Sequence, residues 1–415
     1  MDLLLSLLLM AATPAPASPA RLLAITGVTV IDPDSTPPRP GMTVVISGTR
    51  ITAVGSTGKV SVPRGARILD GTGKFLIPGL WDMHVHLTDA TETAFPLLVE
   101  NGIAGVRDLG GDLTRLDRWR GEIARGTRLG PLILRAGPFV DGPKEVTENR
   151  LAITEPAAAR RAVDSLAARG VDCIKVHNAL PRDAFFAVLN EARKRKLPVA
   201  VHLPQGVTVS EASDSGAASL EHIEMMIESA VNTPGANFTR WDDALAVSQG
   251  ASGAKIFATF VKNGTWYDPT LSAYYRGFVV WEDDPRKVAK RRISLNKLID
   301  LTGDMHHAGV QLLTGSDLGE ASRGIRPGVD LHQELAMLVE AGLHPWEALR
   351  CATLNPARFL HMEDSLGTIA PGKRADLLLL GASPLVNINN SRTIEAVILG
   401  GRLVDLAAIR GKMTR

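Results

Sequence analysis

The pattern of apolar residues along the chain changes twice, near residue 78 and near residue 366. Residues 21–78 contain short runs rich in β-branched residues between Gly, Pro and Asp turns, which is typical of an all-β unit. Strand-like runs return after residue 366, whereas short apolar strands alternate with helical segments in between, as in a parallel sheet. The strands expected in the two all-β regions are residues 23–31, 42–47, 51–54, 66–69, 376–380, 394–398 and 401–404.

The central region contains eight strand-like segments, with helical patterns such as 157–169, 182–196 and 287–307 between them. Eight β/α units over roughly 280 residues match the size of a TIM barrel with insertions. We therefore predict an α/β fold: a TIM (β/α)8 barrel over residues 79–365, with a small β-sandwich domain built from both termini, residues 21–78 and 366–410. The eight predicted barrel strands are residues 80–86, 103–107, 132–135, 173–177, 199–202, 219–222, 265–268 and 310–317.

The first twenty residues resemble a targeting segment more than a part of the fold. Residues 3–12 form an apolar run of the size of a signal-peptide core, too short to span a bilayer, and Ala15-Pro-Ala17 offers a cleavage site before Ser18. Asp2 stands where basic residues are usual in such a segment. We expect residues 1–20 to be a signal peptide or a disordered leader. The first case places the protein in the periplasm or outside the cell, and the second in the cytoplasm.

Composition and charge narrow the class of protein. Hydrophobic residues make up 45% and charged residues 22% of the 415 positions, as in a globular protein with an ordinary core. The formal net charge is only +2 and no long basic block is present, which argues against a nucleic-acid partner. Cys173 and Cys351 lie in separate predicted elements and form no disulfide framework. No segment after the leader predicts a membrane span, and homo-oligomerisation is left open by the sequence.

Six residues with metal-binding chemistry stand at the ends of predicted strands. His84 and His86 alternate on the first strand, so both side chains lie on one face, ~6.5–7 Å apart. The active site of a TIM barrel lies at the C-terminal ends of its strands, so we expect all six to converge there. Imidazole and carboxylate ligands suit Zn²⁺ or a similar first-row ion. The predicted set is His84, His86, Lys175, His202, His222 and Asp317.

Lys175 is the unusual member, because alternation turns it into the barrel together with Cys173 and His177. An unpaired ammonium group is costly to bury. One interpretation is that Lys175 reaches the mouth of the barrel or pairs with an acid. The other is that the neutral amine takes up carbon dioxide. The resulting carbamate would be a carboxylate on a long stem, and it could bridge two cations that otherwise have too few ligands.

With these residues at these positions, the sequence resembles the amidohydrolase superfamily of metal-dependent hydrolases. The resemblance covers nearly the whole chain after residue 20 and is closest to the imidazolonepropionase-related and prolidase-like (Xaa-Pro dipeptidase) branch. The motifs that carry it are residues 75–86, 172–177, His202, residues 221–222, 314–317, 355–360 and 367–377.

The resemblance implies a site with two divalent metal ions, Zn²⁺ by default. Carried over by position, His84, His86 and Asp317 hold the first ion. Lys175, carboxylated on Nζ, bridges the two, and His202 and His222 hold the second.

The implied reaction is hydrolysis of an amide or peptide bond in a small molecule such as a dipeptide or an N-acyl amino acid. Two dications that share a water lower its pKa, so a bridging hydroxide can act as the nucleophile near neutral pH. Asp317 is expected to take the proton and pass it to the leaving amine. The alternatives are a mononuclear cyclic-amide hydrolase or deaminase, a lactonase, and a metal-binding protein without turnover. Lys175 favours the binuclear enzyme, because a mononuclear site has no use for a bridging lysine.

Further polar residues are candidates for substrate contact. Four arginines end the second and third strands or follow the eighth, and a guanidinium group can bind a substrate carboxylate through two parallel hydrogen bonds. The alternative for each is structural pairing with an acid. A histidine on the fourth strand and two tyrosines at and after the seventh could also reach the substrate, with ordinary packing as the alternative. These candidates are Arg107, Arg135, Arg323, Arg326, His177, Tyr267 and Tyr274.

Overall fold

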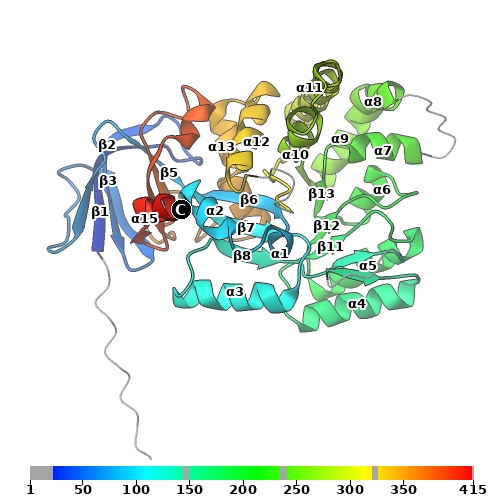
Figure 1. Ribbon diagram of the computed structural model, residues 1–415, viewed down its shortest axis with the longest axis horizontal. Coiled ribbons are helices and arrows are strands. Elements are labelled where there is room, and N and C mark those ends of the chain that lie inside the picture. The colour runs from blue at the N-terminus through cyan, green and yellow to red at the C-terminus, as the bar shows by residue number, and fades with distance from the viewer. Residues whose placement is uncertain (1–21, 144–148, 234–240, 320–325, 414–415) are drawn as a thin grey trace, which may run out of the picture.

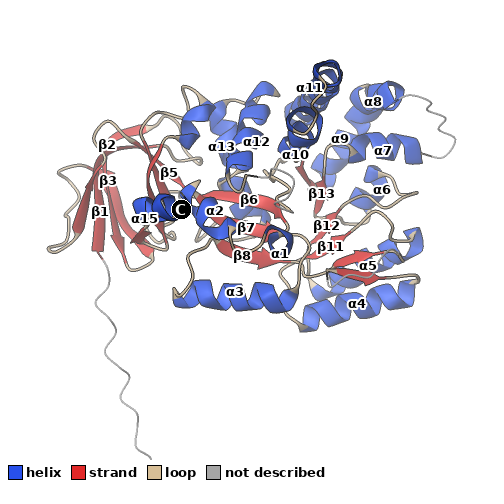
Figure 2. Cartoon of the chain, viewed as in Figure 1, coloured by secondary structure: helices blue, strands red, loops and turns tan. Residues whose placement is uncertain are grey.

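The computed structural model describes residues 22–143, 149–233, 241–319 and 326–413. The leader prediction and the prediction for Arg323 therefore lie outside the described residues. Within them the chain has a mixed α/β fold, in which a sheet formed by the two ends of the chain stands beside a larger body of parallel strands and helices (Figure 1, Figure 2). No helix in these ranges has both the length and the apolar character needed to cross a membrane.

The terminal sheet joins segments from opposite ends of the sequence. Its strand order is β17-β16-β15-β5-β1-β2-β3, with β4 beside β1, and β15 pairs antiparallel with β5 so that Leu378 faces Ile77. Ile46 of β2 and Ile398 of β16 belong to one buried cluster, so the sheet bends around its own core. The predicted division into two sandwich layers is not visible in the hydrogen bonding, which connects all eight strands. They are β1 (Leu22–Val30), β2 (Arg39–Ser47), β3 (Arg50–Ser56), β4 (Arg67–Asp70), β5 (Phe75–Pro78), β15 (Leu377–Leu380), β16 (Ile394–Leu399) and β17 (Arg402–Leu403).

The larger body contains parallel strands in two sheets. One has the order β6-β7-β8 and the other β10-β9-β11-β12-β13-β14. Every pairing within them is parallel, as the alternation of strands and helices in the sequence predicts. The strands are β6 (Leu80–Val85), β7 (Ile103–Asp108), β8 (Leu132–Arg135), β9 (Phe139–Asp141), β10 (Arg150–Ala152), β11 (Ile174–Val176), β12 (Val199–Val201), β13 (Ser219–Glu221) and β14 (Trp266–Asp268).

Seven of the eight predicted barrel strands are present as regular strands, and the third coincides with β8. Two further strands, β9 and β10, were not predicted. Gly137, with a φ of 76°, lies between β8, which pairs with β7, and β9, which pairs with β11. The eighth, residues 310–317, is not a regular strand. It makes isolated parallel bridges at Leu312, to Tyr267 of β14, and at Leu318, to Val85 of β6. This segment therefore runs between β14 and β6, an arrangement consistent with a TIM barrel although the described ladders form no continuous ring.

The helices pack their apolar faces against the parallel strands. The three helices predicted by residue range are confirmed as α4 (Pro156–Ala168), α5 (Arg182–Arg195) and α11 (Pro285–His307). The remaining helices are α1 (Leu87–Ala90), α2 (Ala94–Glu100), α3 (Leu113–Arg125), α6 (Val209–Asp214), α7 (Met225–Asn232), α8 (Trp241–Gln249), α9 (Ala251–Asn263), α10 (Leu271–Tyr275), the π-helix η1 (Arg276–Val280), α12 (Val329–Glu340), α13 (Pro345–Cys351), α14 (Leu354–Phe359), the 3₁₀ helix η3 (Ile388–Arg392) and α15 (Leu406–Met413).

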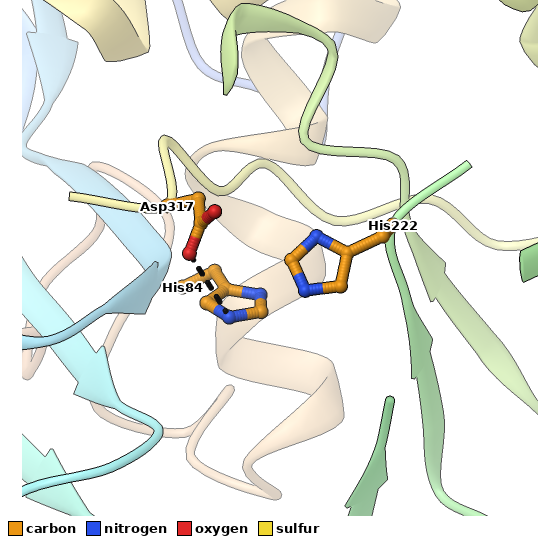
Figure 3. A group of neighbouring side chains, drawn as sticks. All are labelled: His84, His222 and Asp317. Carbon is orange, nitrogen blue, oxygen red and sulfur yellow. Dashed lines mark ion pairs between the residues drawn. The ribbon is translucent and has the colours of Figure 1, made fainter. Parts of the chain in front are cut away.

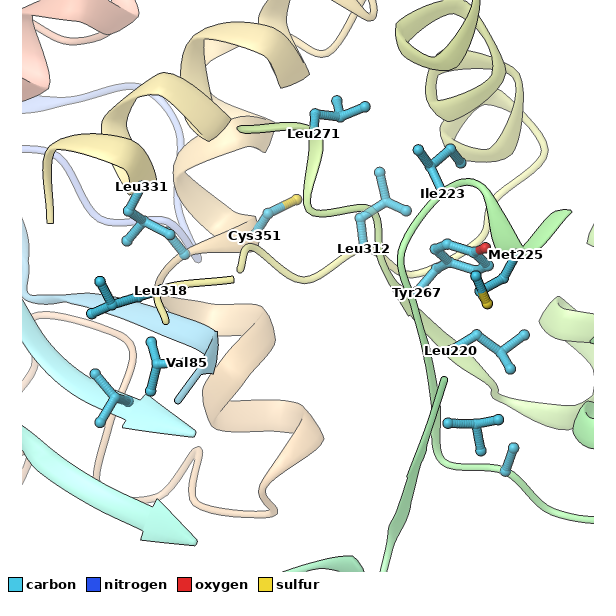
Figure 4. Packing of buried hydrophobic residues seen from close by; sticks show 14 of the residues in the cluster. Val85, Leu220, Ile223, Met225, Tyr267, Leu271, Leu312, Leu318, Leu331 and Cys351 are labelled. Atoms are coloured by element: carbon cyan, nitrogen blue, oxygen red, sulfur yellow. The ribbon is translucent and has the colours of Figure 1, made fainter. Parts of the chain in front are cut away.

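The main apolar core lies between these helices and the strands. Leu220 of β13 is buried beside Tyr267 of β14, and Met225 of α7 packs in the same cluster (Figure 4). Burial of side chains of this size contributes about 1.5–3 kcal/mol each relative to exposure. The apolar residues thus hold the strand ends in place, and the polar residues at those ends are free to form a site.

Candidate metal centre

A cavity of about 360 Å³ lies at the ends of the parallel strands. Its wall contains residues from β6, β11 and the segments that follow β12, β13 and the irregular eighth strand. More than two hundred sequence positions separate the first of these residues from the last. The structure brings all six predicted metal ligands into this one cavity: His84, His86, Lys175, His202, His222 and Asp317.

Three of these residues form a tight donor cluster. The Nε2 atoms of His84 and His86 lie 3.5 and 3.2 Å from Oδ1 of Asp317. Donor atoms of His84, His222 and Asp317 all lie within 4.8 Å of one another. Figure 3 shows the three side chains turned toward one another, with the ion pair between His84 and Asp317 marked. Such a set of imidazole nitrogens and a carboxylate oxygen is suited to a divalent first-row cation.

Three of the four predicted ligand histidines are held in the neutral form that a metal requires. At His86, although burial opposes it, the contact with Asp317 raises the pKa. Burial lowers the pKa of His84 to about 3 and lowers the pKa of His202 and of His222 well below the usual value. The Nδ1 atom of His222 lies 2.9 Å from Oγ1 of Thr270, so its other nitrogen remains available to the cavity. Neutral rings with one nitrogen engaged and the other free fit a metal site.

Lys175 is buried beside the histidines without a carboxylate partner. Its side chain is 1% exposed, and Nζ lies 3.4 Å from Nε2 of His84. No carboxylate in the described part of the chain lies within ion-pair distance of it. Burial lowers the pKa of Lys175 to about 8. The interpretation in which Lys175 reaches the mouth or pairs with an acid therefore does not describe this structure.

A buried ion pair supports His84 from behind. Oε2 of Glu221 lies 3.0 Å from Nδ1 of His84, and Arg107 donates from one nitrogen to both Glu221 oxygens at 2.9 and 3.0 Å. Although burial opposes it, the Arg107 guanidinium and the His84 contact hold the pKa of Glu221 below its usual range. A carboxylate on Nδ1 fixes the tautomer and orientation of the ring, so Nε2 faces the cavity.

We expect Glu221→Gln to weaken metal binding by about 10–100-fold, the usual effect of losing a partner behind a ligating histidine. The amide keeps the shape of the carboxylate but not its charge, so His84 becomes a poorer ligand. Competition with a chelator measures the affinity, and Glu155→Gln, at an exposed position just before α4, is the control. Unchanged affinity in a folded Glu221→Gln protein would remove this role from Glu221.

Two of the predicted ligands have left-handed backbones. The φ angles are 72° at His222 and 52° at Asp317, a region that costs a non-glycine residue free energy. The Tyr267 hydroxyl donates to the carbonyl of His222 at 2.9 Å, and Arg276 donates to the carbonyl of Asp317 at 3.1 Å. The surrounding structure therefore holds both side chains at the cavity against an unfavourable local conformation.

Two of the substrate-contact candidates line the cavity, and they are His177 and Tyr274. His177 stacks on His202 with ring centroids 4.4 Å apart, and its Nδ1 lies 3.3 Å from Oδ2 of Asp141. Burial lowers the pKa of His177 to about 3, so it is a neutral wall of the cavity.

The other described candidates are engaged elsewhere. Arg107 is committed to Glu221, and Tyr267 is committed to the His222 carbonyl. Arg135 donates to Asp117 at 2.6 Å and to the Gly170 carbonyl at 2.8 Å, on the outside of β8. Arg326 pairs with Asp330 and is exposed. None of these four lines the cavity. The structural alternative, pairing with an acid, describes all three arginines. For Arg107 and Arg135, which are buried, such pairing is needed because an unpaired buried charge is unfavourable.

Sequence reasoning did not assign roles to three residues of the site. Glu221 shares the inward face of β13 with Ser219, and alternation along that strand could have revealed it. Phe139 and Glu224 line the cavity from β9 and from the position before α7. No sequence signal marks them, because β9 was not predicted and Glu224 belongs to a segment between a strand and a helix.

Comparison with known proteins identifies the group to which this site belongs. Residues 75–404 match the family described as Amidohydrolase family. The chain belongs to this amidohydrolase family. The match begins in β5, includes every predicted ligand and ends just after β17, so the amidohydrolase region includes part of the terminal sheet.

Curated relatives of this amidohydrolase include adenine deaminases. The chain is 26% identical over 385 residues to adenine deaminase 3 of Rhizobium meliloti, covering 88% of this chain and 54% of that protein. It is 24% identical over 414 residues to an adenine deaminase of Rubrobacter xylanophilus, covering 95% and 60%. The chain thus spans about half the length of the curated relatives it matches.

Solved structures share the fold. A Xaa-Pro dipeptidase with bound methionine has a TM-score of 0.73 and 22% identity, over 92% of this chain and 100% of that one. Molinate hydrolase has a TM-score of 0.74 and 21% identity, over 94% and 96%. At these identities the likeness concerns the fold.

Proposed function

We propose that this amidohydrolase is a binuclear metal-dependent hydrolase of amide or peptide bonds on a TIM barrel, with dipeptides or N-acyl amino acids as substrates. The observation that carries the proposal is the position of Lys175. It is a buried lysine beside His84, without an acid partner in the described residues, in a cavity that it shares with four histidines. Carboxylation would turn an unfavourable buried amine into a bridging ligand.

Each side chain of the cluster has a place in this proposal. His84, His86 and Asp317 would hold one divalent ion, His202 and His222 the other, and carboxylated Lys175 would join them. When bound, such ions polarise the scissile carbonyl and lower the pKa of the attacking water. Glu221 keeps His84 oriented throughout.

Asp317 is the base of the proposed reaction. Its side chain is 30% exposed and faces the cavity, so substrate can approach it. Although burial opposes it, the contacts with His86 and His84 hold the pKa of Asp317 well below its usual value. Asp317 is therefore ionised near neutral pH, ready to take a proton at Oδ and deliver it to the leaving nitrogen.

We expect about two divalent ions per chain, with zinc as the default, because the donor set divides into two groups joined by Lys175. Elemental analysis of protein purified without chelator measures the stoichiometry. A reproducible value near one would instead favour the mononuclear alternative.

The second candidate function is deamination, which the adenine deaminase relatives favour. Both reactions break a carbon–nitrogen bond, so the predicted metal ligands do not distinguish the two functions. A turnover screen can distinguish them, with the metal-loaded protein and dipeptides, N-acyl amino acids, lactones and adenine as substrates. Turnover of adenine without turnover of any peptide or acyl amino acid would replace the first proposal by the second.

A further inference from the structure

The cavity wall outside the predicted ligand set is aromatic and acidic. Phe139 of β9 packs against His86 and His177, with ring centroids 5.4 and 5.2 Å away. Tyr274 of α10 and Phe278 of η1 meet edge to face at 5.9 Å and also line the cavity. Aromatic walls of this kind can receive an apolar stem or the face of a cation.

Glu224 adds a carboxyl group to this wall, and burial raises the pKa of that group. It lies just before α7, two residues after His222, and its side chain lines the cavity near Tyr274 and Asp317. No Lys or Arg in the described ranges forms an ion pair with it. Tyr274 forms a side-chain hydrogen bond with Glu224. A partly buried carboxylate that is held by a hydroxyl and has no ion-pair partner in the described ranges would be stabilised further by a cation.

The described wall of the cavity offers few cationic groups to an anionic substrate beyond the predicted metal ligands. Among the described lining residues Lys175 is the single Lys or Arg, and it points at His84. Arg107, Arg135 and Arg326 are paired with acids away from the cavity. The carboxylate-binding arginine that the sequence predicts is therefore absent from the described wall, and a carboxylate stands there instead.

We propose that Glu224, with Tyr274 and Phe278, binds an ammonium or guanidinium group of the substrate. This inference rests on the proposed amide hydrolysis and narrows its substrate class to amides that carry a basic group near the scissile bond. A cation placed there gains a charge-assisted hydrogen bond from Glu224 and the attraction of the ring faces. The basic group could be the α-amine of a dipeptide or a basic side chain.

The first test measures binding without turnover. Hexylammonium and hexan-1-ol have the same stem but differ in charge, and neither contains an amide bond. Equilibrium dialysis with the metal-loaded protein compares them in wild type, in Glu224→Gln and in Glu228→Gln. Glu228 lies one turn further along α7, is exposed and does not line the cavity, so it is the matched control.

We expect wild type and Glu228→Gln to bind hexylammonium about 10-fold more tightly than hexan-1-ol, and Glu224→Gln to lose most of that preference. An equal preference in Glu224→Gln and wild type would overturn the proposal, as would no preference in wild type. These results hold whether or not any amide is hydrolysed, so failure of the proposed function is seen separately, as a lack of turnover.

The second test distinguishes the two sources of the cation. Ala-Lys is compared with Ala-norleucine for the side chain, and Ala-norleucine with N-acetyl-Ala-norleucine for the α-amine. The pair that Glu224 recognises should show a KM about 10-fold lower for its charged member, and Glu224→Gln should remove that difference with little change in kcat. Equal KM values within both pairs in a protein that hydrolyses them would overturn the proposal.

Discussion

Lys175→Ala is expected to lose one of the two metal ions and most of the activity. The alanine removes the group that would bridge the two sites, and two histidines alone hold a divalent ion weakly. The buried position favours folding of the variant, because it removes an amine whose burial is unfavourable. Elemental analysis and turnover, measured on the same preparation, show both losses.

Rescue by added carboxylic acids distinguishes the loss of a bridging carboxylate from a general structural effect of Lys175→Ala. Formate, acetate or propionate added to Lys175→Ala should restore part of the metal content and part of the turnover, because the small acid can occupy the space that the side chain leaves. Lys194→Ala, at an exposed position of α5, is the control and should behave as wild type with or without acid. A fully active Lys175→Ala protein would end the bridging proposal.

Asp317→Asn is expected to lower kcat by at least ~10²-fold, the lower end of general-base effects. Asparagine keeps the size and one oxygen of the side chain, so it can still contact His86, but it cannot accept the proton. The backbone contacts that hold residue 317, from the His84 carbonyl at 2.9 Å and from Arg276 at 3.1 Å, do not involve the side chain. Folding should therefore be near normal.

Metal analysis and steady-state kinetics together interpret the Asp317 variant. Retained or weakened metal with a collapsed kcat identifies the base, whereas complete loss of metal would show that Asp317 acts chiefly as a ligand. Asp164→Asn on the exposed face of α4 is the control. Wild-type turnover in Asp317→Asn would assign the proton transfer to another group.

Arg107 shows that a basic side chain at the end of a strand does not by itself predict the charge of the substrate. Arg107 lies near the end of the second strand, where a carboxylate-binding residue could stand. Its guanidinium instead donates hydrogen bonds to Glu221 and to the Met83 carbonyl, beside the predicted metal ligands. Glu224 belongs to no motif, and it lines the cavity together with Tyr274 of α10 and Phe278 of η1. The residues proposed to bind the substrate are therefore set by the packing of the segments around the strand ends.

The sequence by itself determined the parallel strands, the three predicted helices and the strand ends at which the predicted metal ligands stand. Each of these depends on local periodicity: alternation puts His84 and His86 on one face of β6, and strand ends of a parallel sheet meet on one side. The resemblance to the family motifs is the source of the proposed grouping of these residues around two ions.

Tertiary structure alone decided what surrounds those ligands. Glu221 meets His84 across 137 sequence positions and Arg107 across 114, and no local pattern encodes such contacts. The unpredicted strand β9 brings Phe139 to the cavity, and the irregular segment around Asp317 is held by Arg276 of a π-helix. The physical reason is that these features follow from long-range packing and from satisfying buried charges, which depend on the whole fold rather than on any one segment.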